Sequence, residues 1–268
     1  MSQSLLKRLT PYLVTLGLSV TAYAAHAQEK LILGNEGAYP PFSMVDASGT
    51  LTGVEPELAR EMCKRMNVEC EFVVMDFKAL IPAILQKKLD LVASQTKPLP
   101  ERVDKVLFGR PILFNPDSYV IPKDKDYQFT KEGLKGLKIG LQRGSAQAKY
   151  VQETFGDAVE IVSFDNPDQI RLDLASGRLD LSLGPKISWT NEFLSKPEGE
   201  NWKFAGGDLW TGGGEKGSSW LARKDSQELL DRVNATLDEI IKDCTFTEIR
   251  KKFMPVELLP EEAACRKG

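Results

Sequence analysis

Arg102 and Glu36 are the charged side chains whose positions favour binding of a small molecule. Each stands in a short stretch that follows an apolar run. Arg102 can hold a carboxylate through two parallel hydrogen bonds, and Glu36 places a negative charge where the cationic end of a ligand could sit. An alternative role for Arg102 is a surface ion pair with Glu101 or Asp104.

A glycine-serine pair and two aromatic rings complete this set. Gly144 and Ser145 precede a predicted helix, whose free backbone N–H groups attract an anion. The alternative is that Ser145 simply caps the helix. Tyr39 and Phe77 can enclose a flat or aliphatic part of a ligand, although ordinary packing is an alternative role for both rings. The convergence of these side chains predicts a binding site for a small charged molecule.

Two segments with the same alternation of strand and helix must position these residues. In the first, apolar runs predict strands over 31–34, 71–75 and 89–94, with helices over 54–66 and 79–87. In the second, the strands are 137–141, 160–164 and 179–183, and the helices are 146–155 and 169–176. Leu58, Met62 and Met66 share one face of the first helix, which marks that face as core.

The alternation predicts an α/β fold with two lobes, each a mainly parallel sheet flanked by helices. We expect residues 28–113 plus 210–268 in lobe 1 and residues 114–209 in lobe 2. The chain crosses at about 113–116 and returns near Gly212-Gly213-Gly214, and a helix over 227–243 returns to lobe 1. Two crossings form a hinge.

Ligands bind beyond the carboxyl ends of parallel strands. Six loops therefore face one predicted cleft. They hold Glu36 and Tyr39, Asp76 and Phe77, 94–102, 142–145, Asp165 and Asn166, and 184–186.

The first 27 residues predict a signal peptide that is cleaved after Ala27. Lys7 and Arg8 precede an apolar stretch, and Ala25-His26-Ala27 has the small-x-small form of a cleavage site. A membrane anchor is the alternative, but the stretch is short and interrupted by polar residues. His26 is the only histidine, so chemistry that needs an imidazole is excluded for the mature protein.

Composition narrows the class of partner. Removal of the signal peptide lowers the 35 basic residues to 33, against 38 acidic ones, a net charge of −5. This balance speaks against nucleic acid or an anionic membrane as a partner. The four cysteines favour disulfides Cys63–Cys70 and Cys244–Cys265 in an oxidising compartment. A zinc site built from all four is the alternative, but it lacks tight paired spacing.

Several short stretches, in this order and spacing, carry a family resemblance over nearly the whole mature chain. They are Gly37-Ala38-Tyr39-Pro40-Pro41-Phe42, Gly53-Val54-Glu55-Pro56-Glu57-Leu58-Ala59, Glu61-Met62-Cys63-Lys64-Arg65-Met66 with Cys70, Ala79-Leu80-Ile81-Pro82, Lys88-Leu89-Asp90, Glu101-Arg102 and Ser176-Gly177-Arg178-Leu179-Asp180. The chain resembles family 3 of the bacterial solute-binding proteins, the polar amino-acid receptors of ABC importers, and most of all the lysine/arginine/ornithine and histidine receptors. The resemblance implies the two-lobed periplasmic-binding-protein fold of type II.

The resemblance also implies roles for single residues. Tyr39 matches a stacking aromatic, Phe77 the apolar wall opposite it, and Glu36 the acid that meets a basic side chain. Ser94 matches a polar ligand contact and Arg102 the carboxylate clamp. The carboxylate grip of the second lobe corresponds to Gly144 and the N–H groups of Ser145 and Ala146. The disulfide of the histidine and arginine receptors corresponds to Cys63 and Cys70.

Three departures from the family pattern concern the ligand. Lys97 stands where these receptors carry Ser or Thr, and Pro185 stands where they carry the aspartate that holds the α-ammonium. Gln95 and Thr96 replace small polar residues. A buried ammonium without an anion is costly, so the loss of the aspartate needs an explanation.

Two explanations are open. Either Asp165 or Glu36 compensates, or the ligand is an N-substituted or multiply carboxylated relative of an amino acid, such as an opine. In the second case Lys97 or Lys186 would meet the extra carboxylate. Lys97 pointing to solvent is the alternative.

The predicted function is the periplasmic substrate-binding component of an ABC transporter for polar or basic amino acids or their derivatives. We expect a monomer that binds an amino-acid-type ligand and an inner-membrane ABC permease, without enzymatic activity, cofactor or metal. One alternative is a dehydratase-type enzyme on the same fold, but Gly184-Pro185-Lys186 occupies the place of its acid/base carboxylate. Another is a partner of a signalling receptor.

Overall fold

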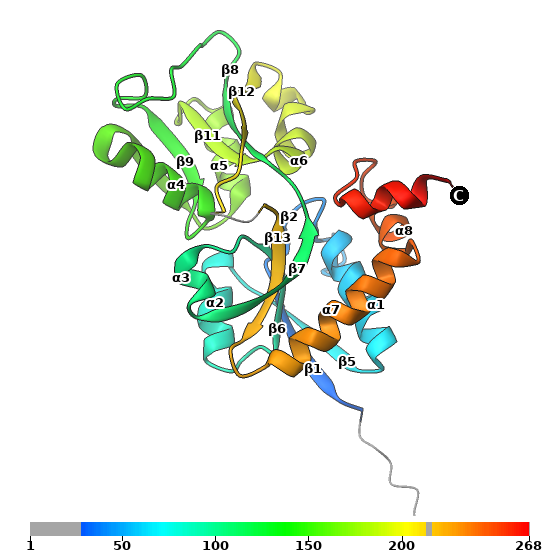
Figure 1. Ribbon diagram of the computed structural model, residues 1–268. Helices are drawn as coiled ribbons and strands as arrows, with labels where there is room; N and C mark the ends of the chain where they lie inside the picture. The colour runs from blue at the N-terminus through cyan, green and yellow to red at the C-terminus, as the bar shows by residue number, and fades with distance from the viewer. Residues whose placement is uncertain (1–27, 213–215, 268) are drawn as a thin grey trace, which may run out of the picture.

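Two five-stranded sheets, each flanked by helices, form the two lobes of the computed structural model (Figure 1). The structure describes residues 28–212 and 216–267. The predicted signal peptide, its cleavage site, and Gly213 and Gly214 lie outside the described residues. Among the residues that the structure describes, no helix combines the length and apolar character needed to cross a membrane.

The sheet of lobe 1 has the strand order β5-β1-β6-β13-β7, in which β5, β1 and β6 are parallel and β13 is antiparallel to both of its neighbours. Its strands are β1 (Lys30–Asn35), β5 (Glu69–Val74), β6 (Leu91–Thr96), β7 (Val106–Leu113) and β13 (Ser218–Arg223). Its helices are α1 (Val54–Met66), α2 (Phe77–Leu85), α3 (Pro100–Val103), α7 (Gln227–Lys242) and α8 (Thr245–Lys251), followed by the 3-10 helix η4 (Pro260–Lys267). A small sheet is made of β2 (Ala38–Tyr39), β3 (Ser43–Val45) and β4 (Leu51–Thr52).

The sheet of lobe 2 repeats this arrangement, with the order β10-β9-β11-β8-β12 and a parallel set of β10, β9 and β11. Its strands are β8 (Asp117–Pro122), β9 (Lys138–Gln142), β10 (Glu160–Phe164), β11 (Leu181–Pro185) and β12 (Trp202–Leu209). Its helices are α4 (Ala146–Phe155), α5 (Pro167–Ala175) and α6 (Lys186–Trp189), with the π-helix η2 (Thr190–Leu194) and the 3-10 turns η1 (Gly156–Ala158) and η3 (Pro197–Gly199).

The chain passes from lobe 1 to lobe 2 between β7 and β8, and it returns between β12 and β13. The parallel strands and helices of the two predicted βαβαβ segments are confirmed, and α1, α4 and β10 have the predicted bounds. Because β13 comes from the far end of the sequence, the sheet of lobe 1 contains both chain segments. The exact lobe boundaries at 113/114 and 209/210 stay a prediction.

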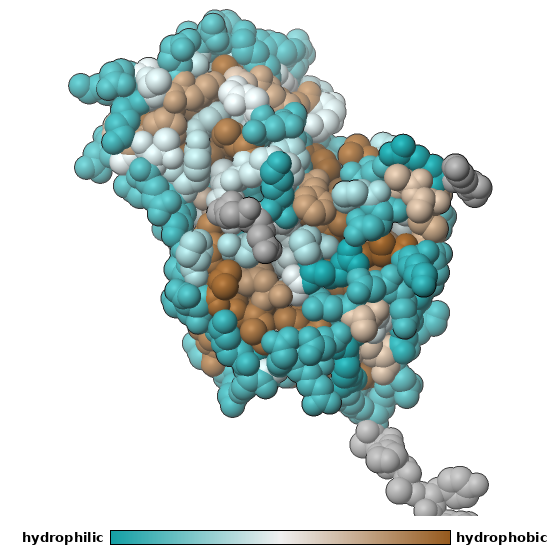
Figure 2. Space-filling model, viewed as in Figure 1, coloured by the Kyte–Doolittle hydropathy of each residue, from teal (hydrophilic) through white to brown (hydrophobic). Residues whose placement is uncertain are grey.

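Both faces of each sheet are buried, which explains why the parallel strands are short apolar runs. In lobe 1, Leu58 and Met62 of α1 pack on one face, and Leu80 and Ile84 of α2 pack on the other. In lobe 2, α4 and α5 cover opposite faces in the same way. Figure 2 shows the result from outside: hydrophilic residues cover the outer ends of both lobes, and hydrophobic residues show mainly along the middle of this face.

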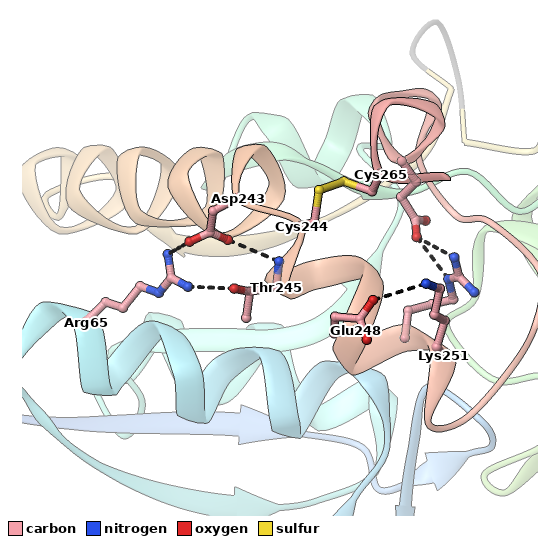
Figure 3. The surroundings of a disulfide bond; sticks show 9 residues. Arg65, Asp243, Cys244, Thr245, Glu248, Lys251 and Cys265 are labelled. Carbon is pink, nitrogen blue, oxygen red and sulfur yellow. Dashed lines mark hydrogen bonds and ion pairs between the residues drawn. A yellow bond between two sulfur atoms is a disulfide. The ribbon is translucent and has the colours of Figure 1, made fainter. Parts of the chain in front are cut away.

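The cysteines form the two predicted disulfides, Cys63–Cys70 and Cys244–Cys265, and no cysteine of the described chain is free. The second disulfide ties η4 to the corner between α7 and α8 (Figure 3). In the same figure, Arg65 of α1 reaches this corner, with Nη1 2.7 Å from Asp243 Oδ2 and Nη2 2.8 Å from Thr245 Oγ1. The thiols are therefore committed to disulfides, and the zinc alternative is wrong.

Candidate functional site

The carboxyl ends of the parallel strands of both sheets meet at one cavity between the lobes, whose free space of about 380 Å³ includes solvent at its open side. Its position agrees with the rule for open parallel sheets. The lining residues are Glu36, Tyr39, Phe77, Gln95, Lys97, Arg102, Gln142, Ser145, Ala146, Gln147, Pro185 and Ser218. Nine of them are predicted site residues, Gln142 belongs to a loop that the sequence placed at the cleft, and Gln147 and Ser218 are additional.

Arg102 is a buried cation without an acidic partner among the described residues. Its Nη1 donates to the carbonyl of Lys97 at 2.9 Å, its Nη2 donates to the carbonyl of Gly144 at 2.6 Å, and its guanidinium lies 5.6 Å from the centre of the Phe77 ring. The neighbouring Glu101 pairs with Lys149 instead. Burial lowers the pKa of Arg102 to about 10, so it stays charged at neutral pH and can accept a carboxylate.

Glu36 also lines the cavity, where its side chain is buried and hydrogen-bonded. Its Oε1 accepts from the side-chain amide of Gln142, which comes from β9 of the opposite lobe. Burial raises the pKa of Glu36 to about 7, against the opposing effect of the Gln142 hydrogen bond. Tyr39 and Phe77 line the same cavity. A cationic group that entered the cavity could pair with Glu36 and contact aromatic surface.

The first turn of α4 faces the cavity from lobe 2. Ser145 caps the helix, because its Oγ accepts from the backbone N–H of Ala148 at 3.1 Å. Gly144 precedes it with φ +74°, a conformation that glycine adopts readily. Both Ser145 and Ala146 line the cavity. The capping role does not exclude the anion-binding one, since the other N–H groups of a helix's first turn lack partners within the helix.

Lys97 does not point to solvent: it forms a buried ion pair with Asp117, and the solvent-facing alternative is therefore wrong. Thr211 donates to Asp117 Oδ2 at 2.7 Å and lies 3.2 Å from Lys97 Nζ. Gln147 donates from its amide to Asp117 Oδ1 at 2.7 Å. Desolvation lowers the pKa of Lys97, and the charge of Asp117 opposes this effect.

Sequence reasoning missed Asp117, Thr211 and Gln147. Asp117 is the one charged residue of an apolar strand that directly follows the crossing between lobes, which is the signal that could have marked it. Thr211 precedes the glycine run of the return crossing. The sequence does not show that these residues contact Lys97, because such contacts depend on the fold; Lys97 and Thr211, for example, lie 114 residues apart in the chain.

Four predicted site residues do not line the cavity. Ser94 and Thr96 are buried within β6, where alternation along the strand turns Gln95 to the cavity instead. Gly144 contributes its carbonyl to Arg102 rather than an N–H to the lining. Asp165 lies outside, paired with Lys78 at 2.7 Å and Arg143 at 2.8 Å. Asp165 is therefore engaged on the rim and does not supply the missing carboxylate in the cavity.

Contacts across the cavity hold the two lobes together. Gln142 with Glu36 and Arg102 with Gly144 join them inside, and Lys149 with Glu101 and Lys78 with Asp165 join them at the rim. The structure is thus a closed arrangement in which the hinge brings the two halves of the lining together. Closure assembles a site that neither lobe carries alone.

Known proteins of similar sequence and structure share this architecture. The chain is 34% identical over 246 residues to the lysine/arginine/ornithine-binding periplasmic protein of Escherichia coli strain K12, covering 90% of this chain and 93% of that protein. It is 32% identical over 250 residues to the histidine-binding periplasmic protein of Salmonella typhimurium, with the same coverage of 90% and 93%. The solved structure of an ancestral arginine-binding protein bound to arginine superposes with a TM-score of 0.77 at 30% identity, covering 85% of this chain and 100% of that one.

The family model of the bacterial extracellular solute-binding proteins, family 3, matches residues 31–256. This match, and the coverage of 93% of each relative, agree with the two-lobed fold and with the cavity between the lobes. The chain belongs to family 3 of the bacterial extracellular solute-binding proteins.

Proposed function

We propose that this protein is the periplasmic substrate-binding component of an ABC transporter and closes its lobes on a small amino-acid-type ligand. The observation that carries the proposal is Arg102, a buried guanidinium that lines the cavity and pairs with carbonyls only. An uncompensated buried cation is costly, and a ligand carboxylate would neutralise it. The names of the relatives, which describe binding of lysine, arginine, ornithine and histidine, support the same ligand class.

The proposed ligand lies along the cavity with its carboxylate at Arg102 and the first turn of α4. Gln95 supports this end, because its buried Nε2 has no partner and can donate to a carboxylate oxygen. The other end of the ligand lies at Glu36, with Tyr39 and Phe77 beside its stem. Arg102 and Glu36 thus define a carboxylate end and a cation end.

Ligand binding favours the closed state, because Gln142, Ser145 and Ala146 reach the cavity only from lobe 2. A ligand shifts the population toward closure by the contacts that it makes only there. The closed monomer would then dock on an inner-membrane permease. Export by the signal peptide, with cleavage after Ala27, places the protein in the periplasm in this proposal.

Removal of the Arg102 guanidinium tests the proposal. Titration calorimetry with L-arginine, L-lysine and compounds identified by native mass spectrometry of the purified protein would first establish a ligand. Arg102→Ala is expected to abolish its binding, whereas Arg110→Ala should keep it, because Arg110 pairs with Asp238 and Glu261 on the surface. Unchanged affinity in Arg102→Ala would remove the carboxylate clamp and contradict the proposed site.

A further inference from the structure

The cleft already contains an ammonium group of its own. Lys97 places its Nζ against Asp117, with Thr211 beside both, and all three side chains are buried. Gly212 leaves room for the lysine stem: a Cβ at this position would lie 3.0 Å from Lys97 Cβ. The aliphatic stem of Lys97 therefore packs against Gly212, and its ammonium is fixed by Asp117 and Thr211.

Both carboxylate oxygens of Asp117 are engaged by protein groups, and the residue is shielded from solvent. Its Oδ2 contacts Lys97 and accepts from Thr211, its Oδ1 accepts from Gln147, and the residue is 0% exposed. Across the antiparallel ladder its register partner is Pro185, which lines the cavity and offers no carboxylate. Among the described residues that line the cavity, Glu36 is the only acidic one.

The pairing of Lys97 with Asp117 decides which charge in the cleft is left for a ligand. Lys97 and Asp117 neutralise each other, so among the described residues that line the cavity Arg102 is the single cation without an acidic partner. Arg102 also contacts the backbone of Lys97, which keeps both cations in the same part of the cavity. An α-ammonium lies one carbon from its carboxylate. Among the described residues it would find no unpaired carboxylate beside Arg102, which is costly in a buried site.

We propose that Lys97 makes this cleft select carboxylates that lack an α-ammonium and carry a cation at the far end. Such a ligand is an ω-guanidino or ω-amino carboxylate: its carboxylate meets Arg102 and its cation meets Glu36. This inference rests on the proposed function and names the ligand class of the same site. It differs from an opine or multiply carboxylated ligand, whose extra carboxylate would have to compete with Asp117 for the ammonium of Lys97.

Matched ligand pairs test the selection without any substitution. Titration calorimetry compares δ-guanidinovalerate with L-arginine and ε-aminocaproate with L-lysine; the members of each pair differ only in the α-ammonium. We expect each desamino compound to bind at least about tenfold more tightly than its amino acid, since this ratio needs only about 1.4 kcal/mol. Equal or tighter binding of L-arginine and L-lysine would overturn the inference and leave the proposed function intact. Binding of none of the four compounds would also overturn this inference, whereas the proposed function is tested separately by the Arg102→Ala variant with its established ligand.

A substitution of Lys97 tests whether this residue causes the preference for ligands without an α-ammonium. Lys97→Ser frees the Asp117 carboxylate to meet a ligand's α-ammonium, so the preference should reverse toward L-arginine. Lys251→Ser, which removes an exposed lysine paired with Glu248 on α8, removes the same charge and should keep the wild-type preference. An unchanged preference in folded Lys97→Ser would overturn the role of Lys97. If this variant does not fold, the wild-type comparison decides.

Discussion

Asp117 of β8 and Pro185 of β11 are register partners in the antiparallel pair at the centre of the lobe 2 sheet. This pairing connects Lys97 and Pro185, the two residues of the cleft that differ most from the family pattern. Proline stands where family relatives are expected to carry an aspartate, and a carboxylate is present on the neighbouring strand instead. Because that carboxylate pairs with Lys97, the chain keeps an acid–ammonium pair at the cleft but supplies both charges itself.

Ligand affinity should depend on pH through Glu36. The pKa of this carboxyl is raised to about 7 by burial, and only its ionised form pairs with a cationic ligand end. Affinity for L-arginine or δ-guanidinovalerate should therefore rise as the pH increases through 7 and weaken by up to about tenfold per unit below it. Calorimetry at pH 6 and pH 8 would measure the change.

Glu36→Gln provides the control for this pH dependence. The variant keeps the size of the side chain and loses the titrating group, so its affinity should be weaker and nearly constant over the same range. A pH dependence that survived in Glu36→Gln would assign it to another group.

Glu55 should make the empty protein less stable at alkaline pH. It lies in the first turn of α1, where Oε1 accepts from the Trp220 indole at 3.2 Å and Oε2 is buried without a partner. Burial raises its pKa from the ordinary value of 4.5 to about 8. The folded state then holds a proton that the unfolded state has lost. This stabilisation is complete below pH 4.5 and is lost as the pH rises through 8.

Urea unfolding at pH 5.5 and pH 8.5 would show this loss as a lower midpoint at the higher pH. Glu55→Gln should reduce the difference between the two midpoints. Glu57→Gln, in the same helix turn, is the matched control, because Glu57 is partly exposed and pairs with Arg60 on the helix surface. Equal pH dependence in both variants would contradict the role of Glu55.

The sequence predicted the elements whose signals are local. Helix α1 ends at Met66 because Asn67 takes the left-handed conformation with φ 53°, and α4 begins at Ala146 because Ser145 caps it. Strands β7 and β13 gave no comparable signal. They pair with each other although more than a hundred residues separate them, so their place depends on the return of the chain from lobe 2.

The same distinction applies to the site. Residues at the ends of parallel strands, such as Glu36 and Gln95, follow from a rule about sheets. The pair of Lys97 and Asp117 does not, because each residue alone fits several environments and only the folded crossing brings them together. Asp165 also follows a parallel strand, so the same rule placed it at the cleft. In the structure it pairs with Lys78 and Arg143 at the rim.

Glu262 should be important for stability and not for binding. Its Oε2 accepts from Arg250 Nε at 2.9 Å and Nη2 at 2.7 Å, and its Oε1 accepts from the backbone N–H of Leu258 at 2.7 Å. Both charged residues are almost fully buried. Glu262→Ala leaves Arg250 without its partner and is expected to cost about 3–5 kcal/mol in urea unfolding.

The neighbouring residue provides the control for Glu262. Glu261 pairs with Arg110 at 2.8 Å at the surface, so Glu261→Ala should cost less than about 1 kcal/mol. Ligand affinity should be unchanged in both variants, since neither residue lines the cavity. Similar costs for the two variants would show that burial of the Glu262 pair adds nothing.

The two disulfides should contribute unequally to stability, because the chain segments that they close differ in length. Cys244 and Cys265 are 21 residues apart, and Cys63 and Cys70 are 7 apart. From the entropy of loop closure in the unfolded chain, replacing the first pair by serine should cost about 3 kcal/mol and replacing the second about 2 kcal/mol. Urea unfolding of the two double variants measures both values. A reversed order would mean that contacts in the folded state, such as the packing of Cys63 in the core of lobe 1, outweigh the entropy of the unfolded chain.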